Sequence, residues 1–86
     1  MPEEQVGRVS HYFGKVSVAG IDVTADEIKV GDKIHITGHT TDFTQTIDSM
    51  QIDNQNVERA TKGDSIGIKV PDRVRPHDIV YRVLPD

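Results

Sequence analysis

Histidine and carboxylate side chains are the main candidates for catalysis or metal binding in this chain, because it contains no cysteine. Disulfides, thiolate metal sites and thiol catalysis are therefore excluded. His35 and His39 have the i, i+4 spacing that binds a metal ion when both residues lie on one helix. The residues around them alternate between apolar and polar types, as in a strand, so we expect neither a metal site nor a cofactor.

Ser10, His11 and Asp22 supply the side-chain types of a hydrolytic triad. The chain lacks the G-x-S-x-G turn that presents a nucleophilic serine, and it lacks the G-x-x-x-x-G-K-[ST] loop that cradles phosphates. The sequence therefore predicts that the chain is not an enzyme and that it binds no nucleotide.

Polar and basic side chains indicate binding instead. Gln45 shares its strand parity with Phe43 and Ile47, so its amide is expected to turn inward and to need hydrogen-bond partners there. Gln45 either braces the loop at residues 38–41 or contacts a partner at the mouth of a barrel. Basic groups near an aromatic ring could hold RNA by phosphate contact and stacking, or could be solvated surface charge. The candidate binding surface comprises Arg8, His11, Tyr12, Lys15, His39, Asp42, Thr44, Gln45, Arg73 and Arg75.

Charge is unevenly distributed along the 86 residues, whose net charge is −4. Residues 21–64 carry nine acidic and four basic side chains, whereas residues 65–86 carry three acidic and four basic ones. An acidic chain attracts phosphates poorly, which argues against a general nucleic-acid binder. A small basic patch on an acidic body is the alternative to ordinary mixed surface charge.

Short alternations rich in Val, Ile and Thr predict an all-β fold. Turn-forming residues separate six expected strands, at residues 6–13, 16–23, 33–37, 43–53, 65–70 and 78–83. Residues 56–60 predict a short helical turn at most. The side chains expected in the core include Val9, Val18, Ile34, Ile36, Ile66, Ile68 and Val70.

Two of these segments change hydrophobic phase, one at Ala19–Gly20 and the other at Asp48–Ser49. A β-bulge would restore the buried face and bend the strand, and bent strands let a small sheet close on itself. We therefore expect one six-stranded closed β-barrel over residues 6–84, preceded by a disordered tail at residues 1–5.

A short motif recurs before three of the expected strands. Gly31, Gly63 and His77 each precede an aspartate and a strand. Glycine supplies a positive φ in a turn, and the aspartate can accept hydrogen bonds from nearby backbone N–H groups. The motif therefore predicts a positive φ at His77 as well.

Three runs of the sequence, at residues 7–9, 28–32 and 60–68, resemble the second domain of translational GTPases such as elongation factor Tu. The resemblance extends from about Val6 to Val83. It implies a six-stranded Greek-key β-barrel of the translation-factor domain 2 type, part of whose face contacts RNA.

The run Gly38–Ile47, with Asp-Phe-Thr-Gln-Thr inside it, is similar to the C-terminal domain of collagenase-like peptidases, and residues 70–78 resemble the end of that domain. Those enzymes carry a similar small barrel after their catalytic domain, and some members resemble RNA-modifying enzymes. The sequence contains neither a GTPase domain nor a peptidase catalytic domain, which indicates an accessory module.

The sequence thus predicts a non-catalytic binding module that is accessory to translation or RNA modification, with RNA, the ribosome or a translation-related protein as its partner. The alternative is a protein-interaction subunit that docks to a separately encoded collagenase-like peptidase or RNA-modifying enzyme. No apolar run is long enough to span a membrane, and the acidic N-terminal residues lack the apolar core of a secretory signal. We therefore expect a cytoplasmic location and no membrane partner.

Overall fold

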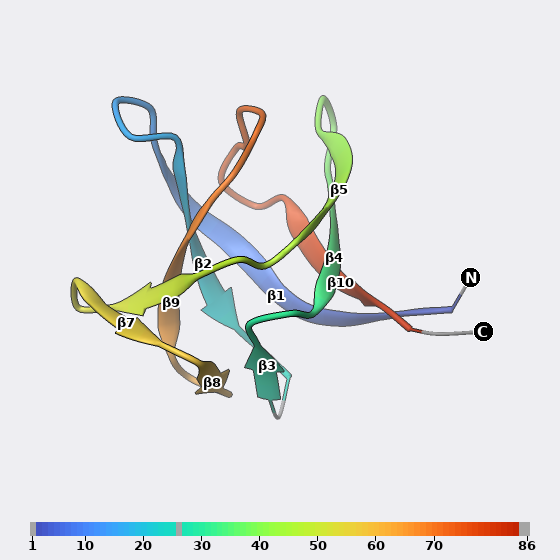
Figure 1. The fold of residues 1–86 in the computed structure, drawn as a ribbon. Coiled ribbons are helices and arrows are strands. Elements are labelled where there is room, and N and C mark those ends of the chain that lie inside the picture. Colours follow the sequence, from blue (N-terminus) through green and yellow to red (C-terminus); the bar gives the residue numbers. More distant parts are fainter. Residues whose placement is uncertain (1, 26, 85–86) are drawn as a thin grey trace.

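The computed structural model describes residues 2–25 and 27–84, in which every regular element is a β-strand (Figure 1). The all-β prediction is confirmed. The strands are β1 (Glu3–Phe13), β2 (Val18–Val23), β3 (Glu27–Lys29), β4 (Lys33–Thr37), β5 (Asp42–Thr46), β6 (Met50–Ile52), β7 (Gln55–Val57), β8 (Arg59–Thr61), β9 (Ser65–Lys69) and β10 (Ile79–Val83).

The sequence predicted six strands, and the structure has ten. The three strands outside the predicted ranges, β3, β7 and β8, have three residues each, too few for an alternating pattern to stand out. The helical turn expected at residues 56–60 is wrong, because these residues belong to β7, β8 and the link between them.

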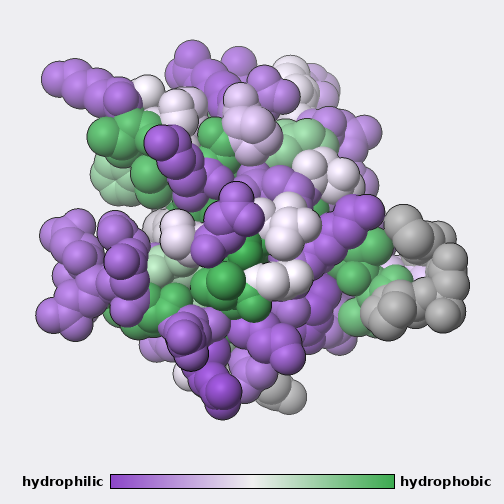
Figure 2. Space-filling model, viewed as in Figure 1, coloured by the Kyte–Doolittle hydropathy of each residue, from purple (hydrophilic) through white to green (hydrophobic). Residues whose placement is uncertain are grey.

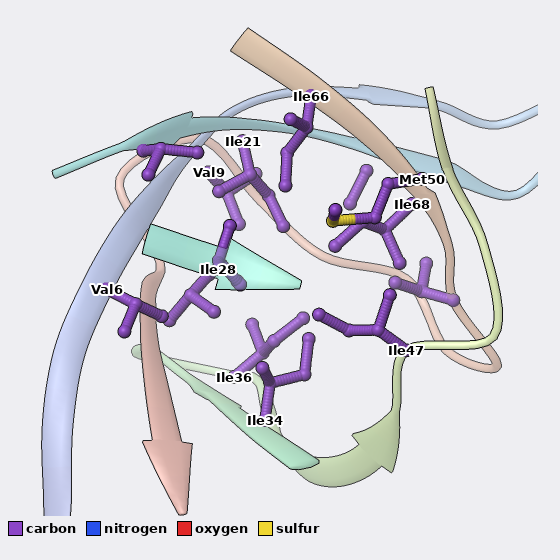
Figure 3. Close-up of a cluster of buried hydrophobic side chains, with 14 of the residues drawn as sticks. Val6, Val9, Ile21, Ile28, Ile34, Ile36, Ile47, Met50, Ile66 and Ile68 are labelled. Atoms are coloured by element: carbon purple, nitrogen blue, oxygen red, sulfur yellow. The ribbon is translucent and has the colours of Figure 1, made fainter. Parts of the chain in front are cut away.

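Eight strands form one antiparallel sheet in the order β5-β4-β10-β1-β2-β9-β6-β7, and β3 pairs with β8 separately. The sheet starts at β5 and ends near β6, the next strand along the chain, so it curls around the core (Figure 3). In the described residues, however, no ladder joins β5 to β9. The expected six-stranded closed Greek-key barrel is therefore corrected to a curled, open sheet.

The sheet fails to close because the long strand expected at residues 43–53 is divided. Its two halves are β5 and β6, with residues 47–49 between them. Ile47 is buried, and its N–H donates to the carbonyl oxygen of Asp32 at 2.9 Å. The first half therefore stays paired with β4, while the second half pairs with β9 and β7. The phase change seen in the sequence marks this break.

The other phase change was assigned to the wrong strand. β2 keeps one phase, with Ala19, Ile21 and Val23 buried. The irregularity lies on β1 instead, where the ladder shifts between Val9 and His11. Val18 had been expected in the core. It is instead half-buried on the outer face of the sheet.

The core gathers side chains from strands all around the sheet (Figure 3). The burial predicted for Val9, Ile34, Ile36, Ile66, Ile68 and Val70 is confirmed. The structure adds other fully buried side chains, among them Val6, Ile21, Ile28, Ile47, Met50 and Val80. Ile28 comes from the unpredicted strand β3, which closes one end of this core.

The expected N-terminal tail is corrected for residues 3–5, which extend β1 and pair with β10; Met1 lies outside the described residues. Arg82 holds this end together. Its guanidinium contacts the Glu4 carboxylate, donates to the Glu27 carbonyl oxygen at 2.8 Å and reaches Asp32 at 3.2 Å. These contacts raise the pKa of Arg82, chiefly through Glu4. An acidic start thus becomes a strand because an arginine on the neighbouring strand pairs with it.

The repeated turn motif is confirmed at all three places. Gly31, Gly63 and His77 have φ values of 98°, 97° and 78°. The following residue, Asp32, Asp64 or Asp78, accepts a hydrogen bond from the backbone N–H three residues earlier, at 3.0, 2.8 and 2.9 Å. The same short sequence therefore builds the same turn before β4, β9 and β10.

Candidate functional site

The open side of the sheet brings together several of the predicted binding residues. Residues 69–75, which start at the last residue of β9, run alongside β5 in the opposite direction. We call the space between them the seam. One hollow of the seam, of about 390 Å³, lies between Asp42 and Phe43 on one side and Arg73 and Arg75 on the other. A second, of about 490 Å³, lies between Gln45 and Thr46 on one side and residues 69–71 on the other.

Gln45 bridges the two sides of the seam. Its side-chain Nε2 donates to the carbonyl oxygen of Lys69 at 2.9 Å. The expectation that Gln45 would brace the loop at residues 38–41 is wrong, because the end of β9 lies closer to its amide. Among the described residues, the Oε1 atom of Gln45 is buried and has no hydrogen-bond partner. A buried acceptor without a donor costs free energy, so this position favours an incoming N–H group.

Arg73 and Tyr12 provide the combination of cation and aromatic ring that the sequence suggested. The Arg73 guanidinium lies over the Tyr12 ring at 6.0 Å from its centroid, a distance at which a cation is attracted to the ring face. Arg75 is positioned through its backbone, whose N–H donates to the buried carboxylate of Asp78 at 2.9 Å. A turn fixed in this way presents both arginines to the same hollow.

Asp42 is one of the three aspartates that line the seam, and it pairs with His35. The Nε2 atom of His35 lies 2.5 Å from Asp42, and its Nδ1 atom lies 2.8 Å from Glu3. Both ring nitrogens donate only in the charged imidazolium. The hydrogen bond to Asp42, helped by Glu3, therefore raises the pKa of His35 above its usual 6.5, against the opposing effect of burial. Glu3, His35 and Asp42 join β1, β4 and β5 on the outer face of the sheet; we call them the histidine clasp.

Other predicted binding residues lie outside the seam. Arg8 lies on the outer face of β1, opposite Asp22 on β2. His11 packs edge-on against Phe13, with ring centroids 4.5 Å apart. Lys15 and His39 are exposed in the turns after β1 and β4. Thr44 is exposed on β5, opposite His35. The structure therefore does not unite the ten predicted residues in one surface.

The structure also has a depression with apolar walls on the outer face, which the sequence did not predict and which we call the hairpin hollow. It has a volume of about 530 Å³, and its apolar part is lined by Phe13 and Val16 from the β1–β2 hairpin and by Val18, Gly20 and Gly67. Polar residues complete the lining, among them Ser10, His11, Gln51, Asp53, Asn54 and Ser65. The two glycines are paired across β2 and β9, so no side chain fills this part of the face. Only the strand register reveals that Gly20 and Gly67 are neighbours.

The hairpin hollow has an apolar rim. Phe13 is 50% exposed and Val16 is 58% exposed. Figure 2 shows apolar surface at the upper left, where the β1–β2 hairpin lies in Figure 1. Exposed apolar groups around a depression are typical of an interaction surface.

Within residues 2–25 and 27–84, no group of three or more His, Asp or Glu side chains could hold a metal ion. In the same part of the chain, no helix is long and apolar enough to cross a membrane.

Comparison with known proteins relates the chain to proteases. No protein-family model matches it. A collagenase of Porphyromonas gingivalis is 41% identical over 78 residues, which are 90% of this chain and 22% of the relative. An uncharacterized protease of Methanocaldococcus jannaschii is 44% identical over 78 residues and is covered to 19% of its length. The chain thus spans about a fifth of the length of these curated relatives.

Solved structures show the same fold. The C-terminal domain of a Geobacillus thermoleovorans protein assigned as a U32 peptidase superposes with a TM-score of 0.86 at 19% identity, over 94% of this chain and 93% of that domain. Its selenomethionine variant gives a TM-score of 0.83. The chain is therefore related in sequence to part of these proteases and has the fold of the C-terminal domain of a U32 peptidase, as the run at residues 38–47 had indicated. The expected likeness to translation-factor domains finds no support in these relatives.

Proposed function

We propose that this chain is a non-catalytic protein-interaction module that acts beside the catalytic part of a collagenase-like protease. The observation that carries the proposal is the extent of the match: 90% of this chain aligns with 19–22% of each protease. The remaining four-fifths of those proteins have room for a catalytic domain, which this small all-β chain does not resemble.

The local geometry of the candidate hydrolytic residues supports a non-catalytic role. The Ser10 hydroxyl donates to the carbonyl oxygen of Gly20 at 3.2 Å. Asp22 accepts a hydrogen bond from Ser65 at 3.0 Å, and His11 packs against Phe13. Each group has a structural partner, and none of these contacts orients a base toward a nucleophile.

We assign the contact with the protease to the hairpin hollow. It combines exposed apolar side chains, Phe13 and Val16, with polar residues such as Gln51 and Asn54, like the apolar centre and polar rim of a protein interface. Phe13 supplies an aromatic anchor of the type that dominates such interfaces.

Affinity purification tests this function. The immobilised chain is incubated with lysate of the cells that produce it, with and without RNase, and captured proteins are identified by mass spectrometry. We expect a collagenase-like protease to be captured in both samples. The double variant Phe13→Ser and Val16→Ser should lose it, whereas Val30→Ser, which changes a valine that is 37% exposed elsewhere, should retain it.

RNA binding is the second candidate, favoured by the position of Arg73 over Tyr12. If it is the function, capture should disappear after RNase treatment, and tRNA affinity should fall linearly with salt on logarithmic axes. The double variant Arg73→Glu and Arg75→Glu should then weaken tRNA binding and flatten that slope. Capture of a collagenase-like protease that persists after RNase treatment would support the protease proposal and contradict RNA binding as the function.

A further inference from the structure

The free edge of β5 has its backbone hydrogen-bonding groups unpaired. Gly38 N–H donates to Thr41 O at 2.8 Å, and Ile47 N–H donates to Asp32 O at 2.9 Å. Hydrogen-bonded pairs alternate along an antiparallel ladder. With these two pairs fixed, the backbone groups of Phe43 and Gln45 face β4.

The same alternation turns the N–H and C=O groups of Asp42, Thr44 and Thr46 away from β4. Within the described residues, none of these groups bonds to another backbone segment. An unpaired row of this kind is a template for another extended chain.

The opposite wall of the seam leaves this edge uncovered. Residues 69–75 approach β5, but among the described residues the hydrogen bond that joins them is the one from the Gln45 side chain to the Lys69 carbonyl oxygen. The hollows on either side of that bond extend along the edge from Asp42 to Thr46. The unpartnered Oε1 atom of Gln45 adds a hydrogen-bond acceptor at the centre of the seam.

The seam carries cations that have no carboxylate partner. Lys69, Arg73 and Arg75 line it, and none of them lies within 4.0 Å of a carboxylate among the described residues. Asp42, Asp48 and Asp72 equal these cations in number, but Asp42 pairs with His35, and none of the three aspartates pairs with Arg73 or Arg75. The two arginines are therefore available to bind carboxylates of a ligand, and this complements an acidic ligand.

We propose that the edge of β5 binds an extended, acidic segment of a client polypeptide as an added strand. The backbone groups of Asp42, Thr44 and Thr46 would pair with the segment, and Arg73 and Arg75 would bind its carboxylates. This inference rests on the proposed function and deepens it: the hairpin hollow holds the protease, and the edge of β5 holds the polypeptide presented to that protease.

Thr44→Pro is the variant that tests the edge. Proline removes the outward N–H of Thr44, and an edge strand tolerates proline where that N–H faces solvent. Thr44→Ala is the matched control, because it removes the same side chain and keeps the N–H. Thermal melting compares the folding of both variants with wild type, and Gln45→Pro, which breaks the ladder to β4, shows how a disrupted strand would melt.

The probe is a phage-displayed library of random linear peptides, selected on the wild-type chain. We expect the enriched peptides to alternate β-branched residues with Asp or Glu. Their binding should weaken about tenfold or more in Thr44→Pro and stay unchanged in Thr44→Ala. Replacing Arg73 and Arg75 by Gln should weaken the binding of acidic peptides and leave the binding of neutral peptides unchanged. N-methylation of alternate residues in an enriched peptide should abolish its binding.

Failure to enrich any peptide, or equal binding to Thr44→Pro and wild type, would overturn the edge proposal. If Thr44→Pro itself melts like Gln45→Pro, the N-methylated peptides decide, because they leave the protein unchanged. The protease capture reports separately on the proposed function. Peptide binding without protease capture would support the proposal for the β5 edge and contradict the proposed function. Protease capture without peptide binding would support the proposed function and contradict the proposal for the edge.

Discussion

The hairpin hollow and the seam are two surfaces on one core, and they differ in what their backbones offer. Under the hairpin hollow, β2 and β9 are fully paired through Gly20 and Gly67, so recognition there depends on side chains such as Phe13. In the seam, β5 is paired on one side only, so the backbone itself can take part in recognition.

This difference follows from one break in the chain. If β5 had continued straight into β6, its outer edge would have faced β9 and the sheet would have closed. Ile47 turns inward instead, and the edge stays free. A small all-β domain can therefore carry an exposed apolar depression and an unpaired strand edge on the same sheet.

Truncation of the shared core should have the largest effect, because both surfaces depend on it. Ile34→Ala on β4 and Ile68→Ala on β9 remove fully buried side chains and should each cost about 2–5 kcal/mol of unfolding free energy. Val18→Ala, in the half-buried wall of the hairpin hollow, should cost less. Chemical denaturation measures all three, and a loss below about 1 kcal/mol at both isoleucines would contradict the assignment of the core.

Two glycine substitutions compare the surfaces directly. A Cβ at Gly38 would lie 1.9 Å from Oδ1 of Asp78, the buried carboxylate that fixes the Arg75 turn. Gly38→Ala should therefore lower the unfolding free energy of the chain by about 1–3 kcal/mol. A Cβ at Gly20 would meet its nearest atom, Ser10 Oγ, at 3.4 Å. Gly20→Ala should consequently leave stability unchanged or raise it by about 0.5–1 kcal/mol, as thermal melting would show.

His77 tests the backbone of the turn that presents Arg75. Its φ of 78° costs an L-residue about 1–2 kcal/mol. His77→Gly should be neutral or stabilising, because relief of this strain offsets the extra flexibility of unfolded glycine. His77→Val should destabilise, since a β-branched residue fits this region poorly. Denaturant midpoints measure both changes; loss of peptide binding by a stable His77→Gly variant would instead assign a direct role to the imidazole.

The histidine clasp beside the seam should make the stability of the chain depend on pH. The pKa of His35 is raised by folding from its usual 6.5, mainly by Asp42. The stability that the charged form contributes is therefore complete below pH 6.5 and is lost as the pH rises through the higher, folded-state pKa. His35→Gln should flatten this part of the pH–stability profile, and His39→Gln, in the exposed turn, should preserve it. An unchanged profile in His35→Gln would show that the clasp does not form.

Local patterns predicted the parts of the fold that local chemistry determines. The turn before β10 could be anticipated at His77 because three copies of a glycine- or histidine-aspartate motif share one backbone geometry. The burial of Ile34 and Ile68 followed from simple alternation. Gln45 could be singled out because an inward amide needs a partner, although the identity of that partner, Lys69, depends on how the two walls of the seam approach each other.

Features that depend on strand register could not be anticipated. The free edge of β5 follows from the turn at Ile47, and the same break in hydrophobic phase also fits a bulge in a closed barrel. The glycine floor of the hairpin hollow requires Gly20 to face Gly67 across two strands far apart in sequence. The histidine clasp likewise joins β1, β4 and β5 through Glu3, a residue expected in a tail.

Amide hydrogen exchange along β5 tests the central claim, the open edge, most directly. In the chain alone, the amides of Asp42, Thr44 and Thr46 should exchange fast, while those of Phe43 and Gln45, bonded to β4, exchange slowly. Addition of a peptide selected on the chain should slow the three fast amides and leave the hairpin at Phe13 unchanged. Slow exchange at Thr44 in the free chain, or protection by the peptide at the hairpin instead of β5, would contradict the account.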